Sequence, residues 1–329
     1  MPAVSALLVF HCDTPFLRPA IASLLGQTFR DMELVLVDNG AGVSADSLGG
    51  LAGDPRLRWV RLEKNLGIPG GHNAGLAAVQ GEFIALLDHD DIALPHRLEK
   101  QVAALRADLG LGLVGSLAES IDEDGIVTGR EFALTAPAAM ARYTQFAAPV
   151  VTPAFTGRRA VFTALPYREA FPFSADFDFL ARAAERWPFA AVPETLLHYR
   201  HHAAQTTIAR RAAIVASETA VRLLTARRRA GRDEDFAVTA AALAQTLQVP
   251  SPPAQSCLLA ARACLAENFF VLAAFHARRA FVHRRDAATL VADLRVFSKI
   301  LARAKNDRMA AARMFFTGPV RALGLRPAI

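Results

Sequence analysis

Three carboxylates stand within four positions where a short apolar run ends. Residues 83–87 read as a buried strand, and Asp88, Asp90 and Asp91 follow it directly. An apolar run of this length suits a central parallel strand covered on both faces. Crowded carboxylates repel one another unless a cation or strong donors offset them, and Mg²⁺ and Mn²⁺ prefer carboxylate oxygens. The pattern therefore predicts a divalent-metal site that holds a phosphate-bearing ligand, against the plainer interpretation of a solvated acidic loop.

The composition is that of a globular chain. Hydrophobic residues make up 53% of the 329 positions and charged residues 21%, enough for one large domain with an appendage. Three cysteines provide no disulfide framework, and Cys257 and Cys264 are expected to be core residues in a reducing compartment. The first apolar run, residues 6–10, is too short for a signal peptide, and no apolar stretch is long enough to span a membrane. We therefore expect a cytoplasmic protein.

Charge is divided unevenly along the chain. Residues 1–200 carry a net charge of −6, whereas residues 201–329 carry +12. Such asymmetry indicates a basic segment with an anionic partner. Because the chain has no basic ribbon interleaved with aromatic residues, no zinc-finger spacing and no RNP-like motif, nucleic acid is not the expected partner.

The first 115 residues alternate between expected strands and helices. Strands are predicted at residues 6–10, 33–37, 58–62, 83–87 and 111–115. Helices are predicted at 17–25 with Thr14 as the cap, at 72–79 after a glycine-rich turn at 67–71, and at 95–107. This alternation favours an α/β fold with a doubly wound, mostly parallel sheet. Ligands bind beyond the carboxyl ends of such strands, so residues 11–13, 38–39 and 88–91 should converge on one crevice.

Several motifs, in order, together resemble the family 2 glycosyltransferases of GT-A fold. They lie within residues 4–208 and comprise residues 33–40, Asn65-Leu66-Gly67, Asn73-Ala74-Gly75-Leu76, 81–91, 175–182 and Tyr199-Arg200-His201-His202. The resemblance implies a nucleotide-sugar donor whose diphosphate is held by Mg²⁺ or Mn²⁺. The metal ligands that it implies are Asp90, Asp91 and His202. The donor-binding residues that it implies are Asp38, Asn39, Asn65, Gly67, Asn73, Asp88 and Arg200.

Two of these segments have plainer interpretations. Asp38 can also be a turn cap, and Asn39 replaces the second acid of the Asp-Asp pair that is usual in the family. The glycine-rich segment 67–71 lacks the Gly-x-Gly-x-x-Gly spacing of a dinucleotide-binding loop. It can bring backbone N–H groups close to a sugar or phosphate, or it can be only a tight turn.

The resemblance places the general base at Asp176, near the start of an apolar helix. An inverting transfer needs a carboxylate that takes the proton of the acceptor hydroxyl as its oxygen attacks. The alternative is an acid in the first turn that the helix dipole favours. Ala175 replaces the acidic neighbour that is usual in the family, and Asp178 is expected at the helix surface or behind the site. Nearer the N-terminus than Asp176, the pair Asp124-Gly125 predicts the turn of a hairpin over residues 121–127.

Residues 209–329 are rich in Ala and Arg with helical patterning, so we predict a catalytic domain at 1–208 and a basic helical region at 209–329. The helical region can be a bundle with a solvated basic face. It can also be a peripheral anchor on the anionic inner face of the membrane, with Phe315, Phe316 and Leu323 inserting near Arg313 and Arg321.

The expected activity is transfer of one sugar from a UDP- or dTDP-sugar to a hydroxyl of a saccharide or lipid-linked glycan, in bacterial surface polysaccharide synthesis. Two alternatives stay open. A nucleotidyltransferase would share the alternation of strands and helices, although no Gly-x-Gly-(Thr/Ser)-Arg loop lies near the first strand. A catalytically inactive, glycosyltransferase-like binding module is favoured by Ala175 and Asn39.

Overall fold

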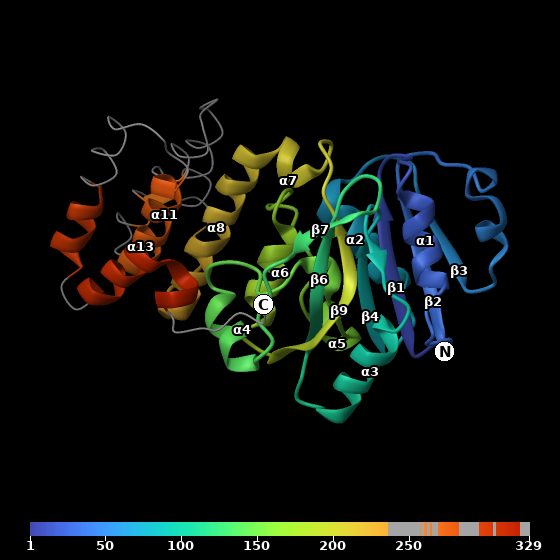
Figure 1. Cartoon of the computed structure of the whole chain (residues 1–329), viewed down its shortest axis with the longest axis horizontal. Helices are drawn as coiled ribbons and strands as arrows, with labels where there is room; N and C mark the ends of the chain where they lie inside the picture. The colour runs from blue at the N-terminus through green and yellow to red at the C-terminus, as the bar shows by residue number, and fades with distance from the viewer. Residues whose placement is uncertain are drawn as a thin grey trace. The chain divides into compact units, whose positions relative to one another are not determined.

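The computed structural model describes residues 1–235, 257, 260–261, 264, 269–282, 296–304 and 307–322. The chain divides into two compact units (Figure 1). The first comprises Met1–Thr144 and Ala148–His202, and the second comprises Gln145–Ala147 and Ala203–Arg326. That residues 1–208 and 209–329 act as two functional domains stays a prediction.

A single sheet forms the centre of the first unit. Its strands are β1 (Val4–Phe10), β2 (Met32–Asn39), β3 (Leu57–Leu62), β4 (Phe83–Asp88), β5 (Ile92–Ala93), β6 (Leu113–Ile121), β7 (Val127–Arg130), β8 (Thr156–Arg158) and β9 (Phe189–Arg200). The order is β3-β2-β1-β4-β8-β6-β9-β5, with β7 beside β6. The strands β3, β2, β1 and β4 are parallel, as are β6 and β9, while β8 runs antiparallel to both neighbours. The expected mostly parallel α/β sheet is confirmed.

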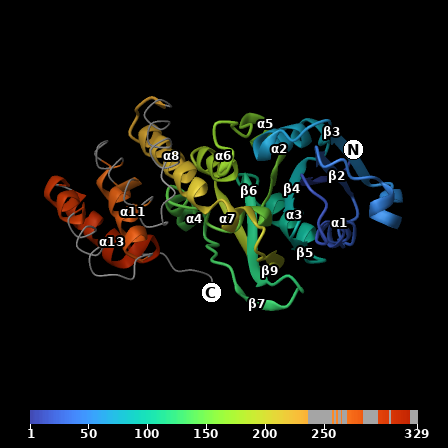
Figure 2. The same ribbon diagram turned by 90° about the horizontal axis from the view of Figure 1, so that it is seen from above.

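Helices cover both faces of this sheet. They are α1 (Leu17–Leu25), α2 (Gly67–Ala78), α3 (Arg97–Ala107), α4 (Pro137–Tyr143), α5 (Arg159–Ala164) and α6 (Ala175–Ala183), with short 3₁₀ segments at Asp46–Gly53 and Thr152–Ala154. Seen from above, α2, α5 and α6 lie on one face and α1 and α3 on the other (Figure 2). Because both faces are covered, the central strands bury nearly every side chain, as their apolar sequences predict.

The register of the parallel strands aligns the polar strand ends. Val9 of β1 pairs with Val37 of β2 on one side and with Asp88 of β4 on the other, and Phe10 pairs with Asp38. The predicted convergence of these segments on one edge of the sheet is therefore confirmed.

The predicted cap of α1 is wrong. The helix begins at Leu17, and no side chain caps it within the described chain. The Thr14 carbonyl accepts the Leu17 N–H at 3.2 Å, whereas the Thr14 hydroxyl is buried and has no hydrogen-bond partner among the described residues. The backbone turn, rather than the side chain, starts this helix.

The predicted start of α2 is also wrong, because the glycine-rich segment is the first part of the helix itself. The helix begins at Gly67, whose φ is +73°. A Cβ at Gly71 would lie 2.8 Å from Asn39 Nδ2, and one at Gly75 would lie 2.4 Å from Leu7 Cδ1. These two glycines therefore allow α2 to pack closely on β1 and β2.

The predicted hairpin is confirmed, since β6 and β7 are antiparallel neighbours. The Asp122 carboxylate accepts the backbone N–H groups of Asp124 at 3.1 Å and Ile126 at 2.8 Å. Gly125 has a φ of +85°, a conformation that glycine adopts without strain.

The second unit is helical where it is described, with α7 (Thr206–Ala209), α8 (Arg211–Arg229), α11 (Phe270–Val282) and α13 (Arg308–Ala322). Cys257 and Cys264 lie fully buried in its core, as predicted. Phe315 is also in this core and only 3% exposed, so its predicted insertion into a membrane is wrong. Leu323 lies outside the described residues. In the described part of the chain, every helix is too short or too polar to span a membrane.

Candidate functional site

The three carboxylates lie in a tight turn between β4 and β5. The N–H of Asp91 donates to the Asp88 carbonyl at 3.3 Å, and β5 then pairs with β9. Carboxylate oxygens of Asp88, Asp90 and Asp91 lie within 4.8 Å of one another, the one group among the described residues with the geometry to hold a metal ion. Asp90 and Asp91 are buried, contrary to a solvated acidic loop.

Burial and crowding make ionisation of Asp88 and Asp91 costly. Burial raises the pKa of Asp88 to about 8, and the charges of Asp90 and Asp176 add to the effect. Burial, then the charges of Asp88 and Asp90, raise the pKa of Asp91 well above its ordinary value. A bound cation would favour the charged forms and offset this repulsion.

One oxygen of Asp91 has the features of a metal ligand. Asp91 Oδ1 accepts the backbone N–H of Arg200 at 2.8 Å. Asp91 Oδ2 is buried and has no hydrogen-bond partner in the described part of the chain. Buried polar atoms are rarely left unsatisfied, so an orphaned carboxylate oxygen beside two further carboxylates fits Mg²⁺ or Mn²⁺.

Arg97 is a buried cation behind the cluster that sequence reasoning missed. Its Nη2 donates to the carbonyls of Leu86 at 2.7 Å and Phe155 at 3.2 Å, and its Nε donates to Gln101 at 3.1 Å. Burial lowers its pKa to about 10, against the charges of Asp91 and Asp88. Arg97 and Gln101, one turn apart on the buried face of α3, were the signal that could have revealed it.

Arg200 and His202, from the end of β9, both contact the acidic turn. The Arg200 guanidinium donates to the carbonyls of Asp90 at 2.8 Å, Asp122 at 2.7 Å and Glu123 at 3.0 Å. His202 Nε2 lies 2.9 Å from Asp90 Oδ2. The structure brings both residues to the predicted site, while the metal contact of His202 and the donor contact of Arg200 stay predictions.

Asp38 has the geometry of a turn cap. Its carboxylate accepts the backbone N–H groups of Ala41 at 2.7 Å, Gly42 at 3.2 Å and Val43 at 3.0 Å, and the residue is 2% exposed. These bonds shape the loop after β2. These hydrogen bonds do not test the predicted contact of Asp38 with a nucleotide, which stays a prediction.

Asn39 joins the end of β2 to the start of α2. Its Nδ2 donates to Asn65 Oδ1 at 3.2 Å and to the Gly67 carbonyl at 3.0 Å, while its Oδ1 accepts the Leu66 N–H at 2.9 Å. Asn65 Oδ1 also accepts the Gly67 N–H at 2.7 Å. Asn39 is buried, whereas Asn65 and Gly67 are exposed at the edge where a donor would bind.

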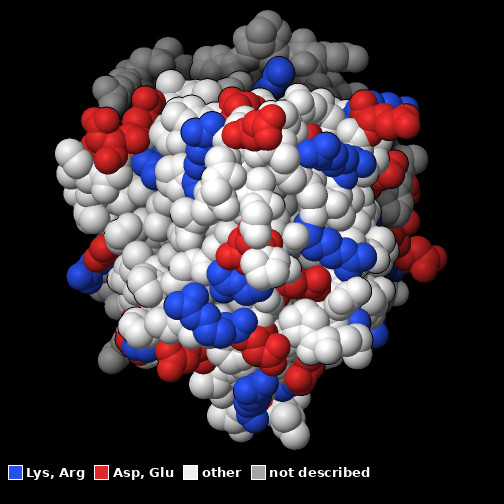
Figure 3. Space-filling model, turned by 90° about the vertical axis from the view of Figure 1, so that its right-hand side faces the viewer, with Lys and Arg blue, Asp and Glu red and all other residues white. Residues whose placement is uncertain are grey.

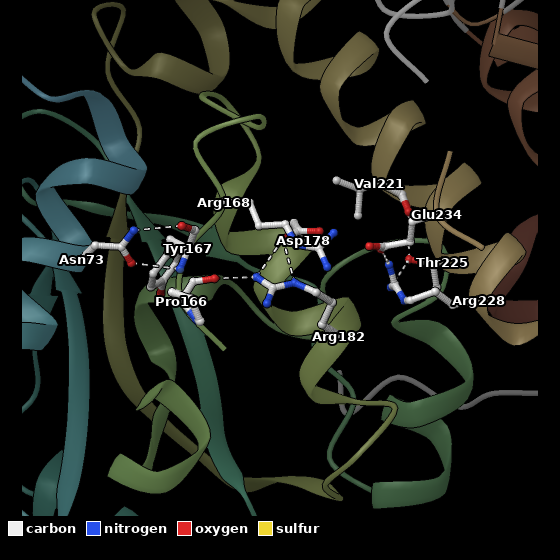
Figure 4. Close-up of polar contacts among 10 residues, drawn as sticks. All are labelled: Asn73, Pro166, Tyr167, Arg168, Asp178, Arg182, Val221, Thr225, Arg228 and Glu234. Carbon is white, nitrogen blue, oxygen red and sulfur yellow. Dashed lines mark hydrogen bonds and ion pairs between the residues drawn. The ribbon is translucent and has the colours of Figure 1, made fainter. Parts of the chain in front are cut away.

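Asn73 faces the segment that leads to α6 (Figure 4). Its Nδ2 donates to the Tyr167 carbonyl at 2.8 Å, and its Oδ1 accepts the Tyr167 N–H at 2.9 Å. The Tyr167 ring stacks on Phe179 with a centroid distance of 5.1 Å, and the His72 ring lies tilted against it at 4.9 Å. Asn73 therefore positions this segment, and its predicted donor contact is untested.

Asp176 lies in the first turn of α6, as predicted. Its Oδ2 accepts the Thr152 hydroxyl at 2.9 Å. Burial and then the charge of Asp176 raise the pKa of Tyr167, and the Asp176 charge also acts on Asp88. The candidate base and the acidic turn therefore share one electrostatic environment.

Of the two positions expected for Asp178, the one at the helix surface is wrong. Asp178 is fully buried, and its Oδ2 accepts Arg182 Nε at 2.8 Å and lies 3.7 Å from Arg168 Nε (Figure 4). The two guanidinium groups offset its charge, so Asp178 secures α6 to the neighbouring loop.

Imidazoles and a thiol surround Asp90 beyond the predicted set. The rings of His11 and His89 are 5.9 Å apart, and Cys12 Sγ lies 3.9 Å from His11 Nε2. Burial lowers the pKa of His89, and burial together with the charges of Asp13 and Asp90 raises the pKa of Cys12. Sequence reasoning placed residues 11–13 at this edge without assigning them a role.

The sequence is similar to the sequences of known proteins. The sequence pattern of Glycosyl transferase family 2 matches residues 5–165. An uncharacterized glycosyltransferase of Methanocaldococcus jannaschii is 30% identical over 206 residues, which cover 60% of this chain and 71% of that protein. The succinoglycan biosynthesis protein ExoO of Rhizobium meliloti is 30% identical over 151 residues, which cover 45% of this chain and 41% of ExoO.

The fold is also similar to that of a solved structure. Residues 1–349 of S. aureus TarS superpose with a TM-score of 0.58 at 14% identity, covering 97% of this chain and 92% of that chain. Crystal structures of TarS in complex with UDP and with UDP-GlcNAc match as well, with TM-scores of 0.55 and 0.52. Motifs, fold and relatives agree, and the chain belongs to family 2 of the glycosyltransferases.

Proposed function

We propose that the protein transfers a sugar from a nucleotide-sugar donor to a hydroxyl of a saccharide or lipid-linked glycan, with a divalent metal ion and inversion at the anomeric carbon. The observation that carries this proposal is the acidic turn with its orphaned Asp91 oxygen. A donor diphosphate must leave with its charge offset, and such a turn suits the ion that does so.

Each part of the site has a role in this reaction. Asp88, Asp90 and Asp91 would hold Mg²⁺ or Mn²⁺, which when bound acts as a Lewis acid on the leaving diphosphate. Asp176 accepts the proton of the acceptor hydroxyl, and the hydroxyl of Thr152 orients its carboxylate.

The donor contacts are proposed with two distinct roles. Asn65 and Gly67 are exposed and can reach a ligand, whereas Asn39 and Asn73 hold the backbone that presents them. Asp38 shapes the neighbouring loop. We also propose that Asp38, Asn39 and Asn73 contact the nucleotide directly.

The donor is proposed to be a UDP-sugar, with a dTDP-sugar as the alternative. Because TarS forms a crystalline complex with UDP-GlcNAc, that compound is the first donor to test. The similarity to a succinoglycan biosynthesis protein supports a role in bacterial surface polysaccharide synthesis.

The proposed macromolecular partner is the anionic inner face of a membrane rather than nucleic acid. Nucleic-acid-binding domains carry a basic patch or stripe on one face. On the face of the first unit shown in Figure 3, Lys and Arg are interspersed with Asp and Glu. The excess of basic residues lies instead after residue 200, where a lipid surface would be met.

A thermal-shift screen of nucleotide sugars, with and without Mn²⁺, identifies the donor because specific binding raises stability by mass action. Product analysis with that donor then separates the alternatives. Nucleoside diphosphate release supports the glycosyltransferase. Pyrophosphate release from a nucleoside triphosphate and a sugar phosphate would indicate a nucleotidyltransferase, and donor binding without turnover would indicate an inactive module.

A further inference from the structure

A cavity in the helical unit has mostly apolar walls. Its volume is about 330 Å³, at the lower end of the range for pockets that bind small molecules. Phe146 and Leu272 of its lining are buried, while Ala226 and Phe270 are half-buried. Every lining residue belongs to the second unit, whereas the acidic turn belongs to the first. The cavity is therefore a site of its own.

Arg222 of α8 lines this cavity although it is only 2% exposed. Its Nε donates to the Phe146 carbonyl at 2.5 Å, and its Nη2 donates to Glu218 Oε2 at 2.8 Å. The guanidinium carbon lies 5.1 Å from the centroid of the Phe275 ring. These contacts fix the guanidinium in place. Arginine is rarely buried, because taking its charge out of water is costly.

The charges around the cavity do not cancel. Glu218 Oε2 also lies 3.2 Å from Arg279 Nη1, so one carboxylate stands between two guanidinium groups and leaves one positive charge over. Arg229 and Asp307, both exposed, line the cavity with opposite charges that offset each other. A bound anion would offset the remaining charge.

A further cation lies against an aromatic wall. The Arg232 guanidinium carbon is 5.2 Å from the centroid of the Phe269 ring, and Phe269 also lines the cavity. The aromatic walls favour a hydrocarbon chain, since burial of apolar surface is favourable. The basic side chains favour a negative head group. Inorganic phosphate would not use the walls, and a neutral hydrocarbon would not use the arginines.

We infer that this cavity binds one anionic lipid, with a hydrocarbon chain against Phe146 and Phe270 and a phosphate head near Arg222 and Arg229. The inference goes beyond sugar transfer and does not depend on it. It assigns to the helical unit a saturable lipid site, in addition to the general attraction of basic residues to an anionic surface.

The test is calorimetric titration of the full chain with decyl phosphate below its critical micelle concentration. We expect saturation at one ligand for each chain. Decyltrimethylammonium should bind about 10-fold more weakly, because the guanidinium groups repel its head, and inorganic phosphate should not bind measurably. Equal affinity for the cationic amphiphile, or for inorganic phosphate, would overturn the lipid site, as would uptake of decyl phosphate without saturation.

A substitution that fills the cavity locates the ligand. Ala230 lines the cavity and is exposed, so Ala230→Trp places an indole there without disturbing the core. It should raise the dissociation constant about 10-fold or more, the effect of excluding two methylene groups of the chain. Ala302→Trp is the matched control, because Ala302 is exposed in the same unit and is not part of the lining. Parental affinity of Ala230→Trp, or an equal loss in Ala302→Trp, would overturn the assignment.

Charge reversal tests the head group. Arg229→Glu should weaken binding of decyl phosphate about 5-fold, an effect limited by the screening of an exposed charge, and Arg229→Lys should stay near the parent value. Arg210→Glu makes the same change of net charge at an exposed position outside the lining, and it should have no effect. Equal losses in Arg229→Glu and Arg210→Glu would overturn the placement of the head.

These titrations contain neither a metal ion nor a nucleotide sugar. Failure of decyl phosphate to bind would overturn the lipid site and leave the proposed sugar transfer standing. A protein that binds decyl phosphate with the expected variant pattern, yet releases no nucleoside diphosphate, would support the lipid site and contradict the proposed function.

Discussion

Asn73 of α2 and Tyr167 are joined by two hydrogen bonds although 94 residues separate them in the sequence. The Asn73 amide satisfies both backbone groups of Tyr167, in the manner of a strand partner. This pairing holds α2, which starts at the predicted donor edge, against the segment that leads to Asp176. The elements on the proposed donor and acceptor sides are therefore tied by the Asn73–Tyr167 pair.

Asn73→Ala should destabilise the first unit by about 2 kcal/mol, because the N–H and C=O of the buried Tyr167 lose their partners. Urea unfolding measures the change. Asn73→Asp keeps the acceptor and loses the donor, so it should fall between the parent and Asn73→Ala. Unchanged stability with lost affinity for a nucleotide sugar would contradict this structural role of Asn73 and favour a donor contact.

Asp176→Asn should lower turnover by about 10²–10⁴-fold, since the amide cannot take the acceptor proton. The amide oxygen still accepts the Thr152 hydroxyl, so the local structure should persist. Donor affinity, measured by calorimetry, should stay near the parent value, because the proposed base acts on the acceptor and not on the donor. Transfer at close to the parent rate would show that another group is the base.

His276 is fully buried in α11, and neither ring nitrogen has a hydrogen-bond partner among the described residues. Burial, and then the charges of Arg222 and Arg279, lower its pKa well below the ordinary value. The folded state therefore keeps the imidazole neutral, whereas the unfolded chain takes up a proton below a pH of about 6.5. The stability present above that pH is lost as the pH falls.

His276→Phe should remove this dependence. Between pH values of about 7.5 and 5.5, the parent should lose about 1.4 kcal/mol more unfolding free energy than the variant. Urea unfolding followed by helical circular dichroism measures both. His96→Phe, at an exposed histidine, should follow the parent. Parallel pH profiles of His276→Phe and the parent would contradict the assignment.

The strand ends of this site could be predicted because each apolar run is followed directly by polar residues, as at Asp38 and Asp88. Parallel neighbours then bring these ends together by geometry alone. The acidic turn was also predictable, because three carboxylates within four positions need a common counter-charge.

The partners of these residues could not be predicted in the same way. In the sequence, Phe16 is only one apolar residue before a helix. The pairing of β5 with β9 brings Arg200 and His202, which follow in the chain, to Asp90. Gly71 was predicted to lie in a turn because glycine favours turns, but packing of α2 on β1 is what requires it. Contacts between segments distant in the sequence determine the surroundings of both Phe16 and Gly71.

Helix α13 presents an apolar surface between basic side chains. Met309 and Phe316 are 74% and 66% exposed, two helical turns apart, and Arg313 is exposed between them. Lys299 and Arg303 are exposed on the preceding helical segment. Each such cation near an anionic leaflet contributes about 1 kcal/mol, which salt reduces.

More of the protein should therefore co-sediment with phosphatidylglycerol vesicles than with phosphatidylcholine vesicles. The bound fraction should fall as the salt concentration rises. Phe316→Ser should weaken binding several-fold, while Leu109→Ser, at a 79% exposed position of the first unit, should not. Equal recovery with neutral and anionic vesicles would leave only a helical bundle with a solvated basic face.

The central claim is that the acidic turn holds a divalent ion needed for release of nucleoside diphosphate. Its most direct test is UDP release from UDP-GlcNAc, or from the donor that the screen identifies, in Mn²⁺ and in EDTA. The parent should release UDP with Mn²⁺ and stop in EDTA, and Asp90→Ala should be inactive in both while keeping the parent circular dichroism. Equal release in EDTA and Mn²⁺, or parental activity of Asp90→Ala, would contradict the account.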